Sequence, residues 1–227
     1  EDVLDVRVLQ AADRPRWYEG DPSSKDLDGD VALLEALAEE YSGIEAPRQR
    51  GEEAAVVGRP AAITTKSVRE VLENDPRLDD VVAAWDHYGN VTGKNDLGRH
   101  RLAAVLGTQH YGDTAIERFA ALVGEEVDTD RGDRSAALEY GGDVANAYLA
   151  HMSEDQTMQA ILRFARGSDG GATVVARTGA LREDLPVVGD AQVVETWSDT
   201  ATEVARAYRR LGAEFTIADV ADAVDVT

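Results

Sequence analysis

The sequence predicts an α/β protein with a mostly parallel sheet flanked by helices, followed by a small helical appendage. Short apolar runs typical of buried strands alternate along the chain with longer segments of helical periodicity. Both faces of a parallel sheet are covered, which accounts for strands that are apolar throughout. A length of 227 residues is enough for one large core, or for one domain with an appendage.

The first half of the chain is expected to alternate strands with helices. Residues 3–9 have the alternation of a strand and lead into a polar loop. Residues 28–41 carry apolar side chains at helical spacing. A short buried strand is expected over residues 61–66, a helix over 67–73 and a further strand over 81–88.

The second half is expected to begin with a glycine-punctuated loop over residues 89–95. The apolar run 102–106 predicts a strand that ends in the polar loop 107–112. At Ser153, a capping box completed by Gln156 predicts the start of a new helix. The remaining elements are expected to be helices over 114–127, 143–151 and 153–166 and a strand over 172–176.

Residues 191–227 are expected to form an appendage after a domain of residues 1–190. A helix is expected over residues 200–211, Gly212 breaks it, and a short helix follows over 217–224. This pattern resembles the first two helices of a helix-turn-helix. A simple helical hairpin that covers the sheet is an equally open alternative.

The excess of acidic residues indicates the environment of the protein rather than its function. Lysine and arginine number 23 against 44 acidic residues, which gives a net charge of −21. Such an acidic chain, with only three lysines, resembles proteins of salt-accumulating archaea, in which carboxylates keep the surface hydrated. Attraction to phosphates is weak in molar salt for any protein, so the acidic charge does not exclude a nucleic-acid partner.

Several classes of protein are excluded by composition. The absence of cysteine excludes disulfides, thiolate zinc sites and cysteine nucleophiles. The four histidines have no metal-ligand spacing, so no metal site is expected. No stretch approaches the roughly 20 apolar residues of a membrane span. Because the chain begins at Glu1 without an apolar signal region, we expect a cytoplasmic protein and a fragment of a longer one.

The segment 158–166 is the most informative candidate for a functional helix. Gln159, Arg163 and Arg166 share one stripe of this helix, while its apolar residues occupy another. Two arginines at this spacing form a permanently charged fork suited to phosphates. A solvated polar face, or arginines paired with some of the many carboxylates, is the alternative.

The Gln-x-x-x-Arg-x-x-Arg pattern, with the glycine-rich turn and strand after it, resembles motif VI of superfamily-two helicases. Leu162 stands where many members have glycine. Residues 63–66 resemble motif IV and residues 87–95 resemble motif V, in the order found in the second RecA-like lobe. The match covers residues 3–176. The stretches His-Tyr-Gly-Asn and Gly-Thr-Gln-His-Tyr-Gly-Asp resemble helicase-like proteins of haloarchaeal plasmids and viruses.

The resemblance implies a RecA-like lobe of an ATP-dependent helicase or translocase. Arg163 and Arg166 would contact the phosphates of ATP, and Gln159 would orient water or a phosphate oxygen. Gly93 would let the backbone approach the nucleotide, where Asn95 can donate and accept hydrogen bonds. The chain lacks a Gly-x-x-x-x-Gly-Lys-Ser/Thr loop, so ATP and Mg²⁺ would be bound mainly by a missing first lobe. Alone, the chain is not expected to hydrolyse ATP.

Contacts to nucleic acid, with DNA favoured, are expected from polar residues where three of the predicted strands end. The candidates are Thr64, Thr65, Lys66, Asn90, Thr108, Gln109 and His110. Their side chains can hydrogen-bond the phosphate backbone. Polar loops in solvent are the alternative, and a tight turn is the alternative for Gly93 and Asn95.

Two other classes of function are left open by the sequence. The first is a non-enzymatic DNA-binding or replication-control protein of a plasmid or virus, whose C-terminal helices read DNA. The second is an unrelated α/β enzyme that acts on a small ligand, which no catalytic motif supports.

Overall fold

The computed structural model describes residues 6–18, 22–23, 27–42, 58–90, 96–127, 139–164 and 171–188. The chain divides into two units, Glu1–Val193 and Val194–Thr227, and every described residue belongs to the first unit. The expected helix-turn-helix appendage at 191–227 lies outside the described residues. No helix in the described part combines the length and apolar character that crossing a bilayer requires.

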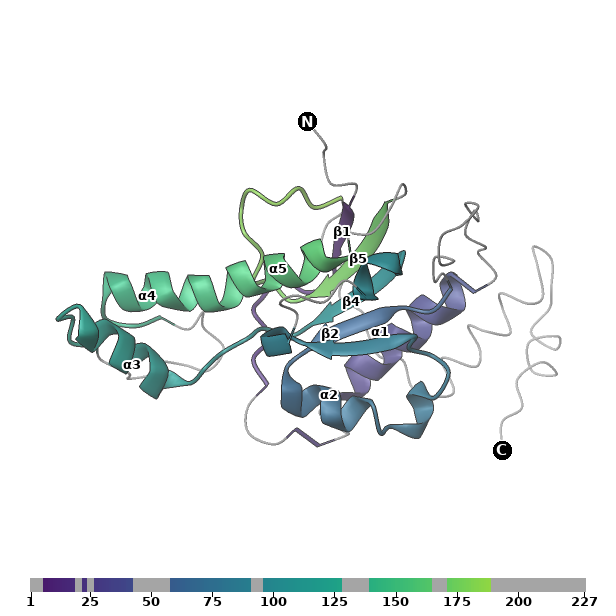
Figure 1. Ribbon diagram of the computed structural model, residues 1–227, viewed down its shortest axis with the longest axis horizontal. Helices are drawn as coiled ribbons and strands as arrows, with labels where there is room; N and C mark the ends of the chain where they lie inside the picture. The colour runs from purple at the N-terminus through teal and green to yellow at the C-terminus, as the bar shows by residue number, and fades with distance from the viewer. Residues whose placement is uncertain are drawn as a thin grey trace, which may run out of the picture. The chain divides into compact units, whose positions relative to one another are not determined.

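Five parallel strands form one sheet in the order β1-β5-β4-β2-β3 (Figure 1). The strands are β1 (Val6–Gln10), β2 (Ala61–Thr64), β3 (Ala84–His87), β4 (Leu102–Leu106) and β5 (Ala172–Arg177). Helices flank the sheet, so the predicted α/β class is confirmed and the architecture is consistent with a RecA-like fold. The strands were predicted most closely where they are central and apolar throughout, as in β4, whose five residues are all buried.

One face of the sheet is covered by α1 (Asp28–Glu40) and α2 (Lys66–Leu72). Leu34 of α1 and Leu72 of α2 are fully buried there, together with Ala104 and Leu106 of the sheet. Both helices agree with the expected ranges 28–41 and 67–73 to within a residue. Their apolar periodicity arises because one stripe of each helix packs on the sheet.

The opposite face is covered by α5 (Gln156–Arg163) and by the short turns η3 (Tyr88–Asn90) and η4 (Asp96–Arg99). Ala160, Ile161 and Phe164 are fully buried against this face. The turns η3 and η4 add Tyr88 and Leu97 to the same core. The sheet therefore lies between two helical layers, as a parallel sheet requires.

The helices α3 (Asp113–Leu122) and α4 (Asp143–Ala150) pack on each other around a separate small core. This core contains Ile116, Ala120, Tyr140, Ala145, Leu149 and Met152. The pair lies to one side of the sheet in Figure 1. The expected helix over 114–127 is shorter than predicted, because Gly124 adopts a positive φ of 81° just after it.

The predicted helix break at residue 152 is wrong, since α4 continues into α5 through the π-helical turn His151–Asp155. Ser153 does not cap a new helix. Its hydroxyl donates to the carbonyl of Leu149 at 2.8 Å, one turn back along the continuous helix. The Ser-x-x-Gln pattern is compatible with an N-cap and also with a hydrogen bond from serine to the preceding turn. In the folded protein the serine forms the second of these.

Candidate functional site

The crevice of an open parallel sheet lies at the carboxyl ends of neighbouring strands whose connections leave in opposite directions. In this sheet those strands are β2 and β4, because β2 leads to β3 on one side and β4 leads to β5 on the other. The turns after β2 and β4 carry Thr64, Thr65 and Lys66, and Thr108 and Gln109. The structure thus brings two of the predicted nucleic-acid-binding turns to one place.

The turn after β2 contains two buried hydroxyls. Thr64 is fully buried, and the Oγ1 atoms of Thr64 and Thr65 have no hydrogen-bond partner. Thr65 stands at the start of α2 without capping it through its side chain. An unpaired buried hydroxyl costs about 1–3 kcal/mol, so the two hydroxyls are well suited to bonding a ligand that enters this turn.

Lys66 follows the two threonines and is exposed. Its Nζ lies 4.0 Å from Glu70 Oε1, one helical turn on. An exposed pair of this kind contributes little and leaves the ammonium group accessible to an anion. The turn therefore combines two buried hydroxyls with one exposed positive charge at the crevice.

Residues 11–18, here called the strap, cross the carboxyl ends of β5 and β4. The backbone bonds that hold it are Ala11 N to Ala176 O at 2.8 Å, Gly179 N to Arg14 O at 2.7 Å and Thr108 N to Arg16 O at 2.8 Å. The sequence predicted a polar loop here, but not that it lies on the ends of the strands. The strap covers the ends of these strands, so it limits which side chains at this edge of the sheet are exposed to solvent.

Thr108 is 1% exposed beneath the strap. Its Oγ1 accepts a hydrogen bond from Arg16 N at 3.1 Å and is paired with Thr178 Oγ1. The hydroxyl that was predicted to contact nucleic acid thus ties the turns after β4 and β5 to the strap. Its neighbour Gln109 is partly exposed.

His110 is held within the protein on both ring nitrogens. Its Nδ1 accepts from Gly112 N at 3.1 Å, so the neutral ring donates through Nε2 to Tyr140 Oη at 3.2 Å. Tyr140 in turn donates to Asp113 Oδ1 at 2.7 Å. The Trp17 ring meets the His110 ring edge-on, 5.3 Å between centroids. His110 joins the strap to the α3–α4 pair.

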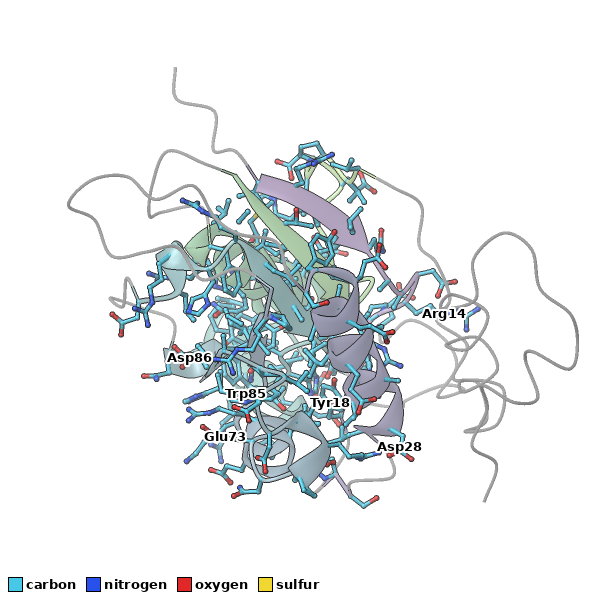
Figure 2. The ribbon with its side chains drawn as sticks, turned by 90° about the vertical axis from the view of Figure 1, so that its right-hand side faces the viewer. Arg14, Tyr18, Asp28, Glu73, Trp85 and Asp86 are labelled. Atoms are coloured by element: carbon cyan, nitrogen blue, oxygen red, sulfur yellow. The ribbon has the colours of Figure 1, made fainter. Side chains whose placement is uncertain are left out.

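Asn90 stabilises the turn after β3. Its Nδ2 donates to Asp86 Oδ1 at 2.9 Å, and the same oxygen accepts from His87 N at 2.9 Å. Asp86 is buried, and Figure 2 shows it close to the neighbouring Trp85. Asn90 itself is partly exposed.

Gly107 is the point at which β4 ends, and it is held from both faces of the sheet. Its φ is +70°, and a Cβ there would overlap the Tyr18 ring. From the other face, Tyr88 donates its hydroxyl to the Gly107 carbonyl at 2.6 Å. Burial raises the pKa of both tyrosine hydroxyls, so both stay protonated. The end of β4 is therefore held by a tyrosine on each face of the sheet.

A charged cluster of Arg16, Asp30 and Arg177 lies beside the strap, and the sequence patterns did not indicate it. Asp30 is 0% exposed in the first turn of α1. Arg16 Nη2 donates to its Oδ2 at 2.8 Å, and Arg177 Nη1 donates to its Oδ1 at 3.1 Å. Arg16 also lies over the Tyr18 ring at 5.1 Å, and Tyr18 packs with the side chains of α1 and α2 (Figure 2).

The predicted polar stripe of α5 is divided in the structure. Gln159 is exposed, whereas Arg163 is 6% exposed. Thr157 lies beside the Tyr88 hydroxyl, near the end of β4, and Arg163 is about 9 Å further along the helix, towards the start of β5. Arg166, Gly93 and Asn95 lie outside the described residues. The roles predicted for these five residues in ATP binding and hydrolysis stay predictions.

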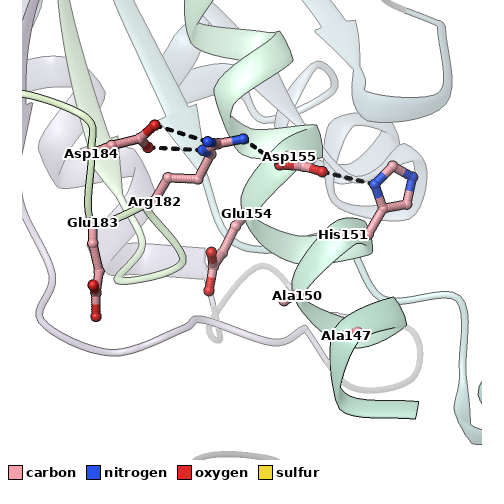
Figure 3. A pocket seen from close by; sticks show the side chains of 8 residues that line it. All are labelled: Ala147, Ala150, His151, Glu154, Asp155, Arg182, Glu183 and Asp184. Carbon is pink, nitrogen blue, oxygen red and sulfur yellow. Dashed lines mark hydrogen bonds and ion pairs between the residues drawn. The ribbon is translucent and has the colours of Figure 1, made fainter. Parts of the chain in front are cut away.

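An open hollow of about 570 Å³ lies beside the π-helical turn (Figure 3). It is lined by Ala147, Ala150, His151, Glu154, Asp155, Arg182, Glu183 and Asp184. Arg182 donates to Asp184 at 2.8 Å and to Asp155 at 3.2 Å, and His151 Nδ1 lies 2.8 Å from Asp155 Oδ2. The hydrogen bond from His151 lowers the pKa of Asp155, while burial raises that of Glu154. The hollow contains none of the predicted site residues.

Among the described residues, no group of three or more histidine or carboxylate side chains is placed to hold a metal ion. The donors that suit phosphate are Lys66, the hydroxyls of Thr64 and Thr65, and the guanidinium groups of Arg16 and Arg177. No protein-family model, curated protein or solved structure matches the chain.

Proposed function

We propose that the chain is the second RecA-like lobe of an ATP-dependent helicase or translocase that acts on nucleic acid. The observation that carries the proposal is the turn Thr64-Thr65-Lys66 at the crevice between β2 and β4, with its buried unpaired hydroxyls and exposed ammonium. The five-stranded parallel sheet supports it. The motif resemblance supplies the class of ligand.

In this proposal the turn after β2 binds the phosphate backbone of a nucleic-acid strand. The hydroxyls of Thr64 and Thr65 donate to phosphate oxygens, and Lys66 neutralises one phosphate. The nucleotide is bound by a first lobe, and closure of the two lobes couples hydrolysis to movement. The contribution of Arg163 and Arg166 to hydrolysis depends on the sequence pattern alone, since Arg163 is buried and Arg166 lies outside the described residues.

The proposal is tested by the fluorescence anisotropy of a labelled single-stranded oligonucleotide titrated with this chain over a series of salt concentrations. We expect Lys66→Ala to weaken binding and to lower the slope of log K against log salt by about 0.7, the loss of one phosphate contact. Thr65→Val should weaken binding without changing the slope, because it removes a donor and no charge.

The matched control is Arg69→Ala. Arg69 lies one turn along α2 and pairs with Glu73 at 3.0 Å, so its loss removes an equal charge away from the crevice. It should leave the affinity nearly unchanged. The proposal is contradicted if the oligonucleotide does not bind, or if Lys66→Ala and Arg69→Ala have the same effect.

A further inference from the structure

Two arginines share one buried carboxylate at the carboxyl edge of the sheet. Asp30 uses one oxygen for Arg16 of the strap and the other for Arg177, the last residue of β5. The pairs are separated in sequence by 14 and 147 positions. Three segments of the chain therefore contribute to a single cluster.

The charges of this cluster do not cancel. A single arginine would neutralise Asp30, and burying a charge requires no more than that. Counted over these three side chains alone, two guanidinium groups stand against one carboxylate, in a chain whose formal net charge is −21. The cluster lies at the carboxyl edge of the sheet, at the ends of β1 and β5 and beside the crevice between β2 and β4.

The geometry of the cluster keeps donors in place for a ligand. A guanidinium has five N–H donors, and the bond to Asp30 uses one of those of Arg177. The side chains of Arg16 and Arg177 keep 29% and 16% of their surface exposed. The Arg177 guanidinium also lies against Gly29, where a Cβ would displace it. Asp30 and Gly29 thus fix the Arg177 guanidinium before any ligand arrives.

We infer that Arg16 and Arg177 bind a phosphate group of a ligand at the carboxyl ends of β1 and β5, and that Asp30 is their positioning residue. The inference rests on the proposed function for the class of ligand, a phosphate ester or anhydride. It does not depend on Lys66 or on the turn after β2. Two guanidinium groups are the side chains best suited to such a group, because each can donate two parallel hydrogen bonds.

The test compares Arg177→Gln with the control Arg182→Gln in the full chain, at constant salt. Arg182 is also an arginine paired with two carboxylates, Asp155 and Asp184, but it lies at the hollow beside the π-helical turn. The probes are pyrophosphate, measured by titration calorimetry, and a labelled single-stranded oligonucleotide, measured by anisotropy. We expect Arg177→Gln to weaken binding of at least one probe about tenfold, and Arg182→Gln to leave both unchanged.

The two probes distinguish the sources of the phosphate. A loss confined to the oligonucleotide assigns the cluster to the nucleic-acid backbone, and a loss with pyrophosphate assigns it to a nucleotide. The inference is overturned if neither probe binds, or if Arg177→Gln binds both as the unchanged chain does. Lys66→Ala distinguishes the two proposals. If Lys66→Ala weakens oligonucleotide binding and Arg177→Gln weakens neither probe, only the inference is overturned. Pyrophosphate binding that needs Arg177, with no oligonucleotide binding, removes only the proposed function.

The role of Asp30 is tested by Asp30→Asn with the same probes. Removal of a negative charge next to two arginines would by itself tighten binding of an anion. Loss of the anchor that orients both guanidinium groups would weaken it. We expect about tenfold weaker binding, and tighter binding would overturn the positioning role. A thermal melt shows whether the variant is folded. If it is not folded, Asp30→Glu and Asp30→Ala are compared instead. Tighter binding by Asp30→Glu than by Asp30→Ala supports the positioning role, and equal binding overturns it.

Discussion

At the scale of single residues, Gly107 is the most constrained position of the candidate site. It combines a φ of +70° with the Tyr18 ring packed on its α-carbon and a hydrogen bond from Tyr88 to its carbonyl. Any side chain here strains the backbone and displaces Tyr18, which itself lies below Arg16. The end of β4 thus depends on the absence of a Cβ.

Gly107→Ala should lower the free energy of unfolding by about 2–4 kcal/mol, from backbone strain and overlap with Tyr18. Urea denaturation followed by circular dichroism measures the loss. Gly124→Ala is the matched control, because Gly124 also has a positive φ, of 81°, but no atoms within 4 Å of its would-be Cβ. Equal losses for the two variants would show that the Tyr18 contact contributes nothing.

His100 is a buried histidine outside the candidate site. It is 1% exposed, its Nδ1 has no hydrogen-bond partner, and burial with help from Arg99 and Arg59 lowers its pKa to about 4. A folded-state pKa below the unfolded value of about 6.5 means that the unfolded chain takes up the proton first. The stability due to neutral His100 is therefore complete above pH 6.5 and is lost as the pH falls towards 4.

His100→Leu should remove this pH dependence. Between pH 7.5 and pH 4.5, the unchanged chain should lose about 1–3 kcal/mol more stability than the variant, measured by urea midpoints. The comparison cancels the titration of the many carboxylates, which both proteins share. His151→Leu, at the exposed His151, is the control. A parallel pH profile for His100→Leu and the unchanged chain would contradict the buried-histidine explanation.

At the scale of elements, the α3–α4 pair is stabilised by a carboxylate from outside α4. Glu125 accepts from Val144 N at 3.1 Å and from Ala145 N at 2.9 Å, the first free amides of α4. Gly142 leaves room for this carboxylate, since a Cβ there would overlap it. The arrangement replaces the N-cap side chain that Gly142 cannot provide.

Glu125→Ala should destabilise the start of α4 by about 1–2 kcal/mol, the usual contribution of a helix cap. Hydrogen exchange of the Val144 and Ala145 amides should accelerate by about tenfold or more, while amides of β4 stay protected. Glu126→Ala changes the exposed neighbouring carboxylate and serves as the control. Unchanged exchange at Val144 and Ala145 in Glu125→Ala would contradict the capping role.

Elements whose sequence pattern has a single structural explanation were predictable from the sequence. The run 102–106 forms β4 as expected, since a strand buried on both faces is apolar at every position. The α4–α5 boundary was not predictable, because the serine at 153 suits both an N-cap and a bond to the preceding turn. Gln159 and Arg163 share one stripe of α5 but differ in exposure, because packing of α5 on the sheet buries Arg163, and this difference could not be predicted from the spacing alone.

At the scale of the whole molecule, the sequence predicted polar turns at the carboxyl ends of the strands but not which side chains are exposed there. Parallel topology places the turns after β2 and β4 together, and this follows from the order of the elements. The strap, by contrast, bonds to Thr108 across 92 positions, and Arg177 reaches Asp30 across 147. No local pattern in the sequence records contacts over such separations.

The net charge of −21 predicts that salt stabilises the whole chain. Repulsion between carboxylates is long-range in dilute buffer, and at 1 M salt the screening length falls to about 3 Å. The melting temperature should therefore rise by about 10 °C or more between dilute buffer and molar KCl, measured by circular dichroism. A melting temperature that stays constant or falls over this range would contradict the adaptation to salt inferred from composition.

The central claim is that phosphates of nucleic acid bind at the carboxyl edge of this sheet. Two-dimensional NMR of the ¹⁵N-labelled chain, titrated with a single-stranded oligonucleotide, tests it most directly. The amide signals of Thr65, Lys66 and Arg177 should shift together with a common affinity, while those of α3 stay in place. Shifts confined to α3 and α4, or no shifts at Thr65 and Lys66 under conditions that saturate binding, would contradict the claim.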